Sequence, residues 1–387
     1  MSSSIEPAVS DCHEPSAPER ANGVPHKVAF VTIVPSPYQR DLFAALAKRR
    51  EIDLNVYYME AGSPDSPWPA VDLERYEHIL PGSWYPIGPV RAHVNWRLPN
   101  LANADFVILS SYTSLTGQLL MHARLRRSRW IFWGERPRTH TGAKGLVQRG
   151  LMSPMSAAAA IVGIGGVARR IYQDHFPRQQ TFNIPYHCDI EAFHRIERPK
   201  RSEGPLTFLF CGQMIARKGL DILLAAFDRL VLAGHDATLR LVGREAELSD
   251  MLRQVDPKTK ARIDYLGFQP PERLPEFFAG NDVFVLPSRH DGWGVVVNQA
   301  LAAGIPVICS DNVGAAMDLV RPGFNGLLVK AGDVDSLAAA LQQLVEAPAV
   351  LDEWSRNARE TSRDLTPEAG AEKWVRVFDS LARSNPS

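Results

Sequence analysis

The first residues that could do chemistry follow a short apolar run, 283–286, which predicts a buried strand. Two glycines come next and let backbone N–H groups approach a ligand closely. The helix expected over 294–303 would offer its N-terminus to an anion such as a diphosphate. A carboxylate before the turn can accept hydrogen bonds from ligand hydroxyl groups, and an amide two turns into the helix faces the same side. These candidate ligand-binding residues are Asp291, Gly292, Trp293, Gly294 and Gln299.

A second candidate group lies upstream, after the strand expected over 206–211. Its loop ends in Arg-Lys-Gly before a predicted helix. Two cations beside a helix N-terminus can offset the negative charge of a leaving phosphate. Taken singly, each group also fits a plain structural interpretation, a βα turn or a solvated basic pair. Their occurrence together favours a site that includes Gly212, Gln213, Arg217 and Lys218.

The elements that must position these residues alternate between strand and helix patterns, which is typical of parallel, doubly wound sheets. Residues 59–100, rich in proline and tryptophan, interrupt the pattern and predict a long loop region. Strands are expected at 28–34, 54–58, 106–109, 130–133, 160–164, 206–211, 238–242, 263–266, 282–286, 305–309 and 326–329. Helices are expected at 38–49, 114–127, 166–175, 219–233, 244–255, 271–279, 294–303 and 333–346.

The alternation predicts two Rossmann-like α/β domains that face a cleft at the carboxyl ends of their strands. The charged segment RIERPKRSEGP, which contains two prolines and a glycine, separates them. The tail is expected to be disordered because it is polar and lacks an apolar run. The expected divisions are a tail at 1–25, a first domain at 26–195, a linker at 196–204, a second domain at 205–365 and a C-terminal helix at 366–387 that crosses back to the first domain.

The second half resembles the retaining glycosyltransferases of family four. The resemblance rests on Gly212…Lys218-Gly-x-Asp221, Leu241-Val-Gly243, Leu266-Gly267, Pro287-Ser…Ala302-Ala-Gly304-x-Pro306 and Pro322-Gly-Phe-Asn325. Weaker likeness in the first half covers Val34-Pro-Ser-Pro-Tyr38, Trp133-Gly-Glu135 and Asn183-Ile-Pro…Asp189. The resemblance implies a GT-B fold with a nucleotide-sugar site in the second domain and a glycan or lipid-linked acceptor at the first. It further implies transfer with retention of configuration, without a metal or other cofactor, in polysaccharide or glycoconjugate synthesis.

Matched position by position, the family's two glutamates fall on Asp291 and Gln299, which would contact the donor sugar and the ribose hydroxyls. The family's diphosphate-binding arginine and lysine fall on Gln213 and Lys218. Lys218 and Asp291 are therefore the catalytic candidates in this domain. Three departures from the pattern leave open a weakened or inactive protein that binds nucleotide sugars as a regulator. Further donor contacts implied by the resemblance are Gly243 and Phe268.

The acceptor side is expected after the strand at 130–133, where Glu135 is the catalytic candidate and His140 a second polar group. An ion pair of Glu135 with Arg136 or Arg138 is the alternative interpretation. Ser36 and Tyr38 open the first βα loop and would face the donor phosphates across the cleft, unless Tyr38 serves only in packing.

The charges exclude some function classes. Lys plus Arg and Asp plus Glu number 43 each, which argues against a nucleic-acid binder. Residues 121–200 nevertheless carry 14 basic and 5 acidic side chains, and the basic segment 121–150 suits an anionic membrane surface. The N-terminus resembles no signal peptide, so we expect a cytoplasmic protein, with the basic segment as its peripheral contact to the inner face of the membrane. A dinucleotide-dependent oxidoreductase is excluded because no Gly-x-Gly-x-x-Gly follows the first strand. An epimerase on the same fold stays a weaker alternative.

Overall fold

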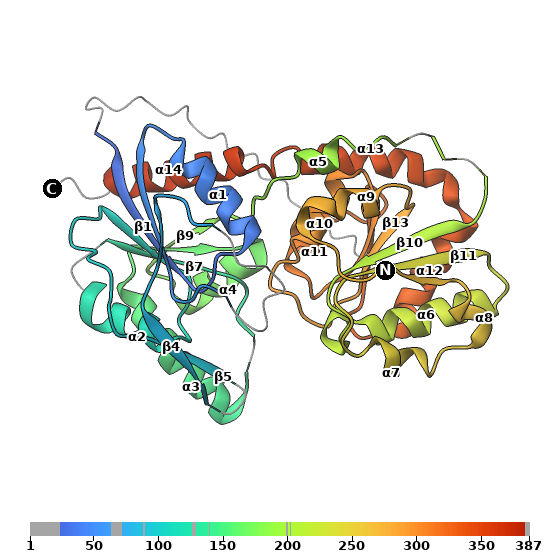
Figure 1. Ribbon diagram of the computed structural model, residues 1–387, viewed down its shortest axis with the longest axis horizontal. Helices are drawn as coiled ribbons and strands as arrows, with labels where there is room; N and C mark the ends of the chain where they lie inside the picture. The colour runs from blue at the N-terminus through green and yellow to red at the C-terminus, as the bar shows by residue number, and fades with distance from the viewer. Residues whose placement is uncertain are drawn as a thin grey trace, which may run out of the picture.

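The protein consists of two α/β lobes joined by short segments (Figure 1). The computed structural model describes residues 24–62, 72–87, 90–125, 129–138, 140–198, 200–201 and 203–383. Most of the predicted disordered tail, together with Arg126 and Arg127 of the basic segment, lies outside the described residues. The expected fold class is confirmed: both lobes are built on parallel sheets covered by helices.

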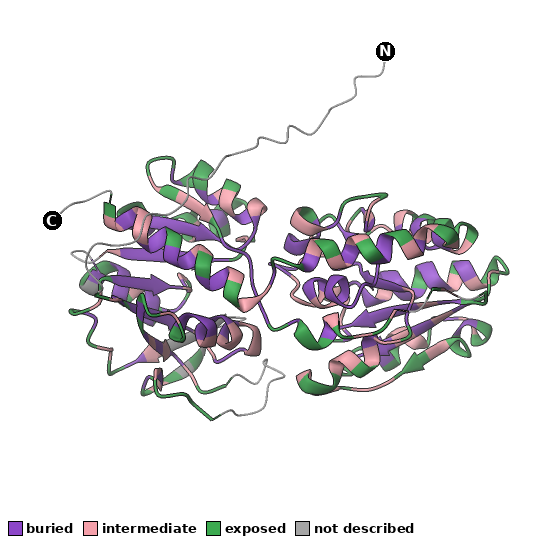
Figure 2. Cartoon of the chain, turned by 90° about the horizontal axis from the view of Figure 1, so that it is seen from above, coloured by how far each residue is buried: buried purple, intermediate pink, exposed green. Residues whose placement is uncertain are grey.

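The first lobe contains a seven-stranded sheet in the order β3-β2-β1-β6-β7-β8-β9, and every pairing is parallel. Its central strands are continuous apolar runs because helices cover both faces, as Figure 2 shows by the buried strands between half-exposed helices. The strands are β1 (His26–Thr32), β2 (Ile52–Tyr58), β3 (Glu77–Ile79), β6 (Phe106–Leu109), β7 (Trp130–Gly134), β8 (Ala160–Gly163) and β9 (Gln180–Asn183).

The helices of this lobe follow the strands. They are α1 (Pro37–Ala47), α2 (Leu115–Leu119), α3 (Gly142–Met152), α4 (Gly166–His175) and α5 (Glu191–His194), with a π-helical turn at Leu120–Arg124 and a 3-10 turn at Ser153–Ala157.

The prediction of a long loop region over 59–100 is wrong in part. The segment contains β3 and an antiparallel hairpin of β4 (Gly82–Ile87) and β5 (Val90–Asn95). A two-stranded hairpin tolerates proline because each of its strands is an edge strand. The prolines of this segment therefore favoured a loop in the sequence although strands form there.

The second lobe contains a six-stranded parallel sheet in the order β12-β11-β10-β13-β14-β15. Its strands are β10 (Leu206–Cys211), β11 (Ala237–Val242), β12 (Ile263–Tyr265), β13 (Val283–Leu286), β14 (Val307–Ser310) and β15 (Gly326–Val329). Its helices are α6 (Leu220–Leu232), α7 (Leu248–Leu252), α8 (Pro257–Lys260), α9 (Leu274–Phe278), α10 (Val296–Ala302), α11 (Gly314–Leu319), α12 (Val334–Glu346) and α13 (Leu351–Ser362). Short 3-10 turns cover Ala216–Lys218, Pro271–Arg273 and Pro348–Val350.

The order of the strands predicts where a ligand binds. In each sheet the chain runs outward in one direction and then returns to the middle, which creates a switch point between β1 and β6 and another between β10 and β13. Ligands of open α/β sheets bind outside the carboxyl ends of the strands at such switch points. The loops after these four strands are therefore the places to look for a site.

The last helix, α14 (Pro367–Arg383), lies against α1 of the first lobe (Figure 1). The Trp374 ring is fully buried, and its centroid lies 5.2 Å from that of Phe30 and 5.6 Å from that of Trp133. Edge-to-face aromatic packing of this kind adds to the area that the rings bury. The helix thereby ties the C-terminal part of the chain to the first sheet.

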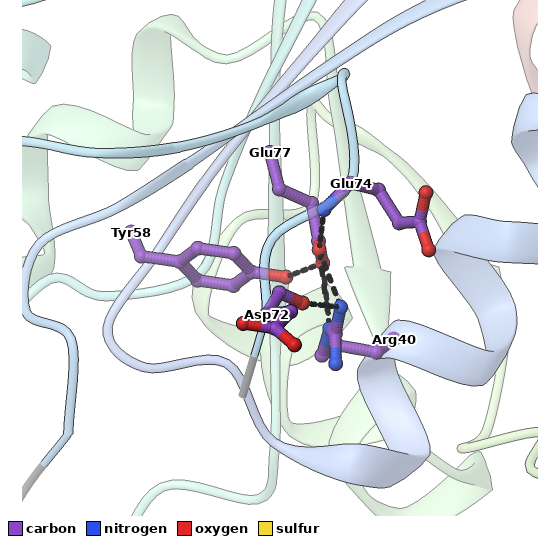
Figure 3. Close-up of polar contacts among 5 residues, drawn as sticks. All are labelled: Arg40, Tyr58, Asp72, Glu74 and Glu77. Atoms are coloured by element: carbon purple, nitrogen blue, oxygen red, sulfur yellow. Dashed lines mark hydrogen bonds and ion pairs between the residues drawn. The ribbon is translucent and has the colours of Figure 1, made fainter. Parts of the chain in front are cut away.

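A buried ion pair fixes the segment before β3 (Figure 3). Arg40 on α1 donates to both carboxylate oxygens of Glu77, the shortest bond being 2.7 Å, and the Tyr58 hydroxyl donates to Glu77 at 2.6 Å. The Glu74 backbone N–H also donates to Glu77, and Arg40 donates to the Asp72 carbonyl. Burial alone would raise the pKa of Glu77, but these bonds outweigh it and leave the pKa lowered.

Replacing Glu77 by alanine is expected to lower the free energy of unfolding by about 3 kcal/mol, because the half-buried Arg40 loses its partner. The pKa of Glu77 is lowered on folding, so its contribution is present above the unfolded pKa and is lost as the pH falls through the folded one. Urea unfolding at pH 7 and at acid pH measures both effects. Glu74→Ala, which removes only an exposed side chain, is the control, and equal losses in both variants would contradict the assignment.

Candidate functional site

A cleft of about 550 Å³ lies between the two lobes. Its walls come from the loops after β1, β6 and β7 on one side and after β10 and β13 on the other, so the two switch points meet there. Seven residues singled out in the sequence line it: Ser36, Tyr38, Glu135, Arg217, Lys218, Asp291 and Gly292.

Lys218 and Asp291 form an ion pair at the floor of this cleft. The Lys218 Nζ lies 2.5 Å from Asp291 Oδ2, and the two side chains are 18% and 13% exposed. Lys218 ends a 3-10 turn, and Gly219 follows with a φ of 75°. A Cβ on Gly219 would lie 2.0 Å from the Pro287 carbonyl oxygen. Only glycine therefore allows the turn that positions Lys218 in the cleft.

The backbone of Asp291 is held by the loop after β14. Its N–H donates to the Asn312 carbonyl at 3.1 Å, and its carbonyl accepts from Gly314 at 3.2 Å. The next residue, Gly292, touches the other lobe: a Cβ there would lie 1.8 Å from Glu135 Oε2. Glycine at this position lets the second lobe approach the carboxylate of the first.

Glu135 leaves the end of β7, where the Tyr172 hydroxyl donates to its carbonyl at 2.8 Å. Its side chain is open to solvent through the cleft, but the two lobes surround it otherwise. Burial among these groups, followed by the charge of Asp291, raises the pKa of the Glu135 carboxyl. A hydrogen bond from the Tyr186 hydroxyl and the charge of Lys218 oppose the shift. Glu135 is thus a carboxyl group with altered acidity at the meeting point of the lobes.

Tyr38 begins the wall opposite the ion pair. Its ring packs on Tyr186 with centroids 4.7 Å apart, and Ser36 precedes it as a buried residue at the start of α1. Burial, followed by the charge of Glu135, raises the pKa of the Tyr38 phenol, which therefore stays protonated at neutral pH.

Two arginines meet at His290. Arg217 donates to the His290 carbonyl at 3.3 Å, whereas Arg136 reaches across from the first lobe to His290 Nδ1 at 3.4 Å and to the Asn312 side-chain oxygen. Burial and then the Arg136 charge lower the pKa of His290. The alternative in which Arg136 pairs with Glu135 is wrong, because the guanidinium bonds to the second lobe instead.

Gly212 and Gly243 directly follow β10 and β11 and lie beside each other, and a Cβ on Gly243 would lie 1.9 Å from the Gly212 carbonyl oxygen. They stand outside the cleft wall, as do other predicted donor or acceptor residues. Those not lining the cleft are Gly212, Gln213, Gly243, Phe268, Trp293, Gly294, Gln299 and His140; of these Gln213, Phe268 and His140 are exposed.

Trp293 packs between the lobes. It is 1% exposed, and a Cβ on Gly165 of the first lobe would meet its ring at 2.7 Å. Its indole N–H donates to Asn298, whose side chain in turn donates to the Tyr186 carbonyl at 2.9 Å. Trp293 therefore packs at the contact between the two lobes, and its expected contact with the donor stays a prediction.

Arg136, Tyr172 and Tyr186 are among the cleft residues that the sequence analysis did not single out as ligand-binding. A weak signal existed only for Arg136, which sits in the Arg-Pro-Arg run beside Glu135. Tyr172 belongs to a segment with no motif, and Tyr186 lies within the stretch Asn183-Ile-Pro…Asp189 at a position that the resemblance does not specify; the fold brings both to the cleft.

A larger cavity of about 840 Å³ lies at the linker, between Arg198 and Arg359 among others, and contains no predicted site residue. Within the described ranges, no cluster of three or more His, Cys, Asp or Glu residues has the arrangement of a metal site. None of the helices in those ranges combines the length and apolar character needed to span a bilayer.

Comparison with known proteins agrees with this architecture. The family described as "Glycosyl transferases group 1" matches residues 193–361. The D-inositol 3-phosphate glycosyltransferase of Rhodococcus erythropolis is 30% identical over 191 residues, 47% of this chain and 41% of that protein. Among solved structures, the sucrose-phosphate synthase of Thermosynechococcus elongatus has a TM-score of 0.69 at 18% identity, covering 93% of this chain and 100% of that one. Anabaena HepE in complex with UDP has a TM-score of 0.69 at 16% identity, covering 92% and 100%.

The chain spans less than half the length of the D-inositol 3-phosphate glycosyltransferases and other relatives most similar in sequence. The likeness to solved structures instead extends over both lobes and concerns the fold, which is the two-domain GT-B arrangement. The second lobe, which carries Lys218 and Asp291, coincides with the matched region. Residues 193–361 therefore match the family of glycosyl transferases group 1, within a chain of GT-B fold.

Proposed function

We propose that this protein transfers a sugar from a nucleoside diphosphate sugar to a hydroxyl group of a glycan or lipid-linked acceptor, with retention of configuration and without a metal or other cofactor. The observation that supports the proposal most is the cleft itself. It brings the Lys218–Asp291 pair of the group 1 domain within one cavity with Glu135 of the first lobe. Polysaccharide or glycoconjugate synthesis on the cytoplasmic side of a membrane is the corresponding role.

In the proposed reaction, the bond between the anomeric carbon and the diphosphate oxygen breaks, and its electron pair leaves with the diphosphate. Lys218 and Arg217 stabilise that developing charge. The acceptor oxygen bonds to the anomeric carbon on the face that the diphosphate leaves, which preserves the configuration. Glu135 takes the acceptor proton, and Asp291 orients the sugar hydroxyls. The meeting of the lobes excludes the water that would hydrolyse the donor.

The test is an assay of purified protein with a panel of UDP- and GDP-sugars, membrane extract as the source of acceptors, and mass spectrometry of the products. NMR of the product determines the anomeric configuration, and EDTA tests metal independence. Formation of a glycosylated product supports the proposal. Nucleotide binding without release of sugar supports the regulator alternative, and a rearranged sugar without any acceptor identifies an epimerase.

We also propose that α3 rests on an anionic membrane, where a lipid-linked acceptor would be found. Leu146 and Val147 on this helix are 65% and 63% exposed, and Lys144 and Arg149 flank them. Gln118 of α2 donates to the carbonyl of Leu151, which places α2, with exposed Leu115 and Leu119, beside α3. Apolar side chains bordered by basic ones are suited to the interface of an anionic bilayer.

Sedimentation with phosphatidylglycerol vesicles is expected to remove the protein from solution at low salt, and phosphatidylcholine vesicles are expected to leave most of it behind. The double variant Leu146→Asp, Val147→Asp should lower the bound fraction several-fold. Leu232→Asp, which alters an exposed leucine on α6 of the other lobe, is the control. Equal sedimentation with both lipids would refute the membrane contact.

A further inference from the structure

Arg136 is a half-buried cation that no described carboxylate neutralises. Its guanidinium donates to His290 Nδ1 and to the Asn312 amide oxygen, both of which are neutral acceptors. No ion pair joins it to any carboxylate within the described ranges, and Asp311 acts on it only as a more distant charge. Burial lowers the pKa of Arg136, as expected for a charge removed from water without a counter-ion. Such a charge is costly unless a ligand completes its environment.

The surroundings show which ligand suits it. Arg136 comes from the loop after β7, and Arg217 and Lys218 come from the 3-10 turn after β10; all three converge on the adjacent residues His290 and Asp291. The Asp291 carboxylate partly neutralises the charge of Lys218, whereas Arg217 and Arg136 bond only to neutral atoms in this cleft. A group of cations with this surplus is complementary to a compact, doubly charged anion. Guanidinium groups bind phosphate oxygens in a bidentate manner.

The position of Arg136 indicates which phosphate it would contact. Arg136 is the neighbour of Glu135, on the acceptor side of the cleft. In the proposed function the second lobe holds the nucleotide, with Arg217 and Lys218 at the diphosphate, and Glu135 of the first lobe meets the acceptor. The sugar-bearing phosphate then lies nearer to the first lobe.

We infer that Arg136 binds the sugar-bearing β-phosphate of the donor from the opposite domain, a role that rests on the proposed function. Arg217 and Lys218 are the cations that the second lobe places at the leaving group, and Arg136 adds a further cation from the first lobe. Because the residue belongs to the first lobe, full diphosphate binding requires the lobes to be together. A nucleoside monophosphate does not reach Arg136 and binds without this requirement.

A purely structural bridge is the competing explanation, because Arg136 also connects the lobes through Asn312. The two roles make different predictions. A bridge affects every ligand equally, and its loss is reproduced by Asn312→Ala. A phosphate contact discriminates between diphosphates and monophosphates and survives the loss of Asn312.

Calorimetric titration of the full chain with UDP, GDP, UMP, GMP and inorganic pyrophosphate tests the inference. Arg136→Gln should weaken binding of the preferred nucleoside diphosphate by about 10- to 100-fold, the effect of losing hydrogen bonds to a charged group, and change monophosphate binding less than about threefold. Arg136→Lys keeps the positive charge but not the bidentate guanidinium group. Its affinity for the diphosphate should lie between those of the unchanged protein and Arg136→Gln. Asn312→Ala should bind the diphosphate within about threefold of the unchanged protein.

Arg178→Gln is the matched control, because Arg178 is exposed before β9 at the amino ends of the strands, the edge opposite to the cleft. Thermal unfolding of each variant checks that it is folded. Equal weakening of mono- and diphosphates, or an Asn312→Ala variant as weak as Arg136→Gln, would overturn the inference. Absence of binding for every nucleotide in the unchanged protein would instead refute the proposed function.

Discussion

Replacing Lys218 by alanine is expected to lower the turnover of sugar transfer by about 100-fold or more, the scale of losing one charge-stabilising donor in a preorganised site. The Nζ lies 2.5 Å from Asp291 and lines the cleft where the diphosphate would leave. The variant removes the cation from the leaving group and also leaves the Asp291 carboxylate, 13% exposed, without its partner. Both effects act on the transition state more than on the bound donor, so kcat should fall more than KM rises.

Turnover with saturating donor is the measurement. Lys258→Ala, on α8 of the same lobe, removes an equal charge away from the cleft and should retain near-normal turnover. Thermal unfolding distinguishes a chemical defect from a folding defect. If Lys218→Ala kept full turnover, the leaving group would have to be held elsewhere, and the site proposed here would be wrong.

The second lobe was predictable because its functional residues lie in the loops that follow its two central strands, β10 and β13. The strands expected at 206–211 and 326–329 match β10 and β15 in both bounds. Apolar runs fix where such strands end, and the next residues must enter the switch-point loops. Lys218, Asp291 and Gly292 reached the cleft for this reason. The prediction of a long helix over 244–255 is wrong, because only Leu248–Leu252 is α-helical.

The first lobe was less predictable, because its contribution depends on contacts between distant segments. Nothing local to Arg136 indicates that its side chain crosses to Asn312. Trp293 lies within the strongest motif, yet the approach of Gly165 turns it into a packing residue between lobes. A spacing pattern identifies which loop a residue occupies, whereas the direction of its side chain depends on how the two lobes meet.

Replacing Glu135 by glutamine is the second large expected effect, a loss of about 100-fold in turnover, as for removal of a positioned proton acceptor. Gln cannot take the acceptor proton, although it is nearly isosteric and can still accept the Tyr186 hydrogen bond. Burial and the nearby Asp291 raise the pKa of Glu135. The ionised fraction, and with it the rate, should therefore fall at a higher pH than for an ordinary glutamate.

The pH profile separates this role from a structural one. In the unchanged protein, kcat should decline as the pH falls through the raised pKa of Glu135, because the carboxylate becomes protonated and can no longer accept a proton. In Glu135→Gln that decline should disappear, and the lower rate should stay flat until the remaining carboxylates titrate. Glu353→Gln, an exposed acid on α13, should keep the original profile. If Glu135→Gln kept the same acidic decline, the decline would not come from Glu135, and its role as the proton acceptor would be refuted.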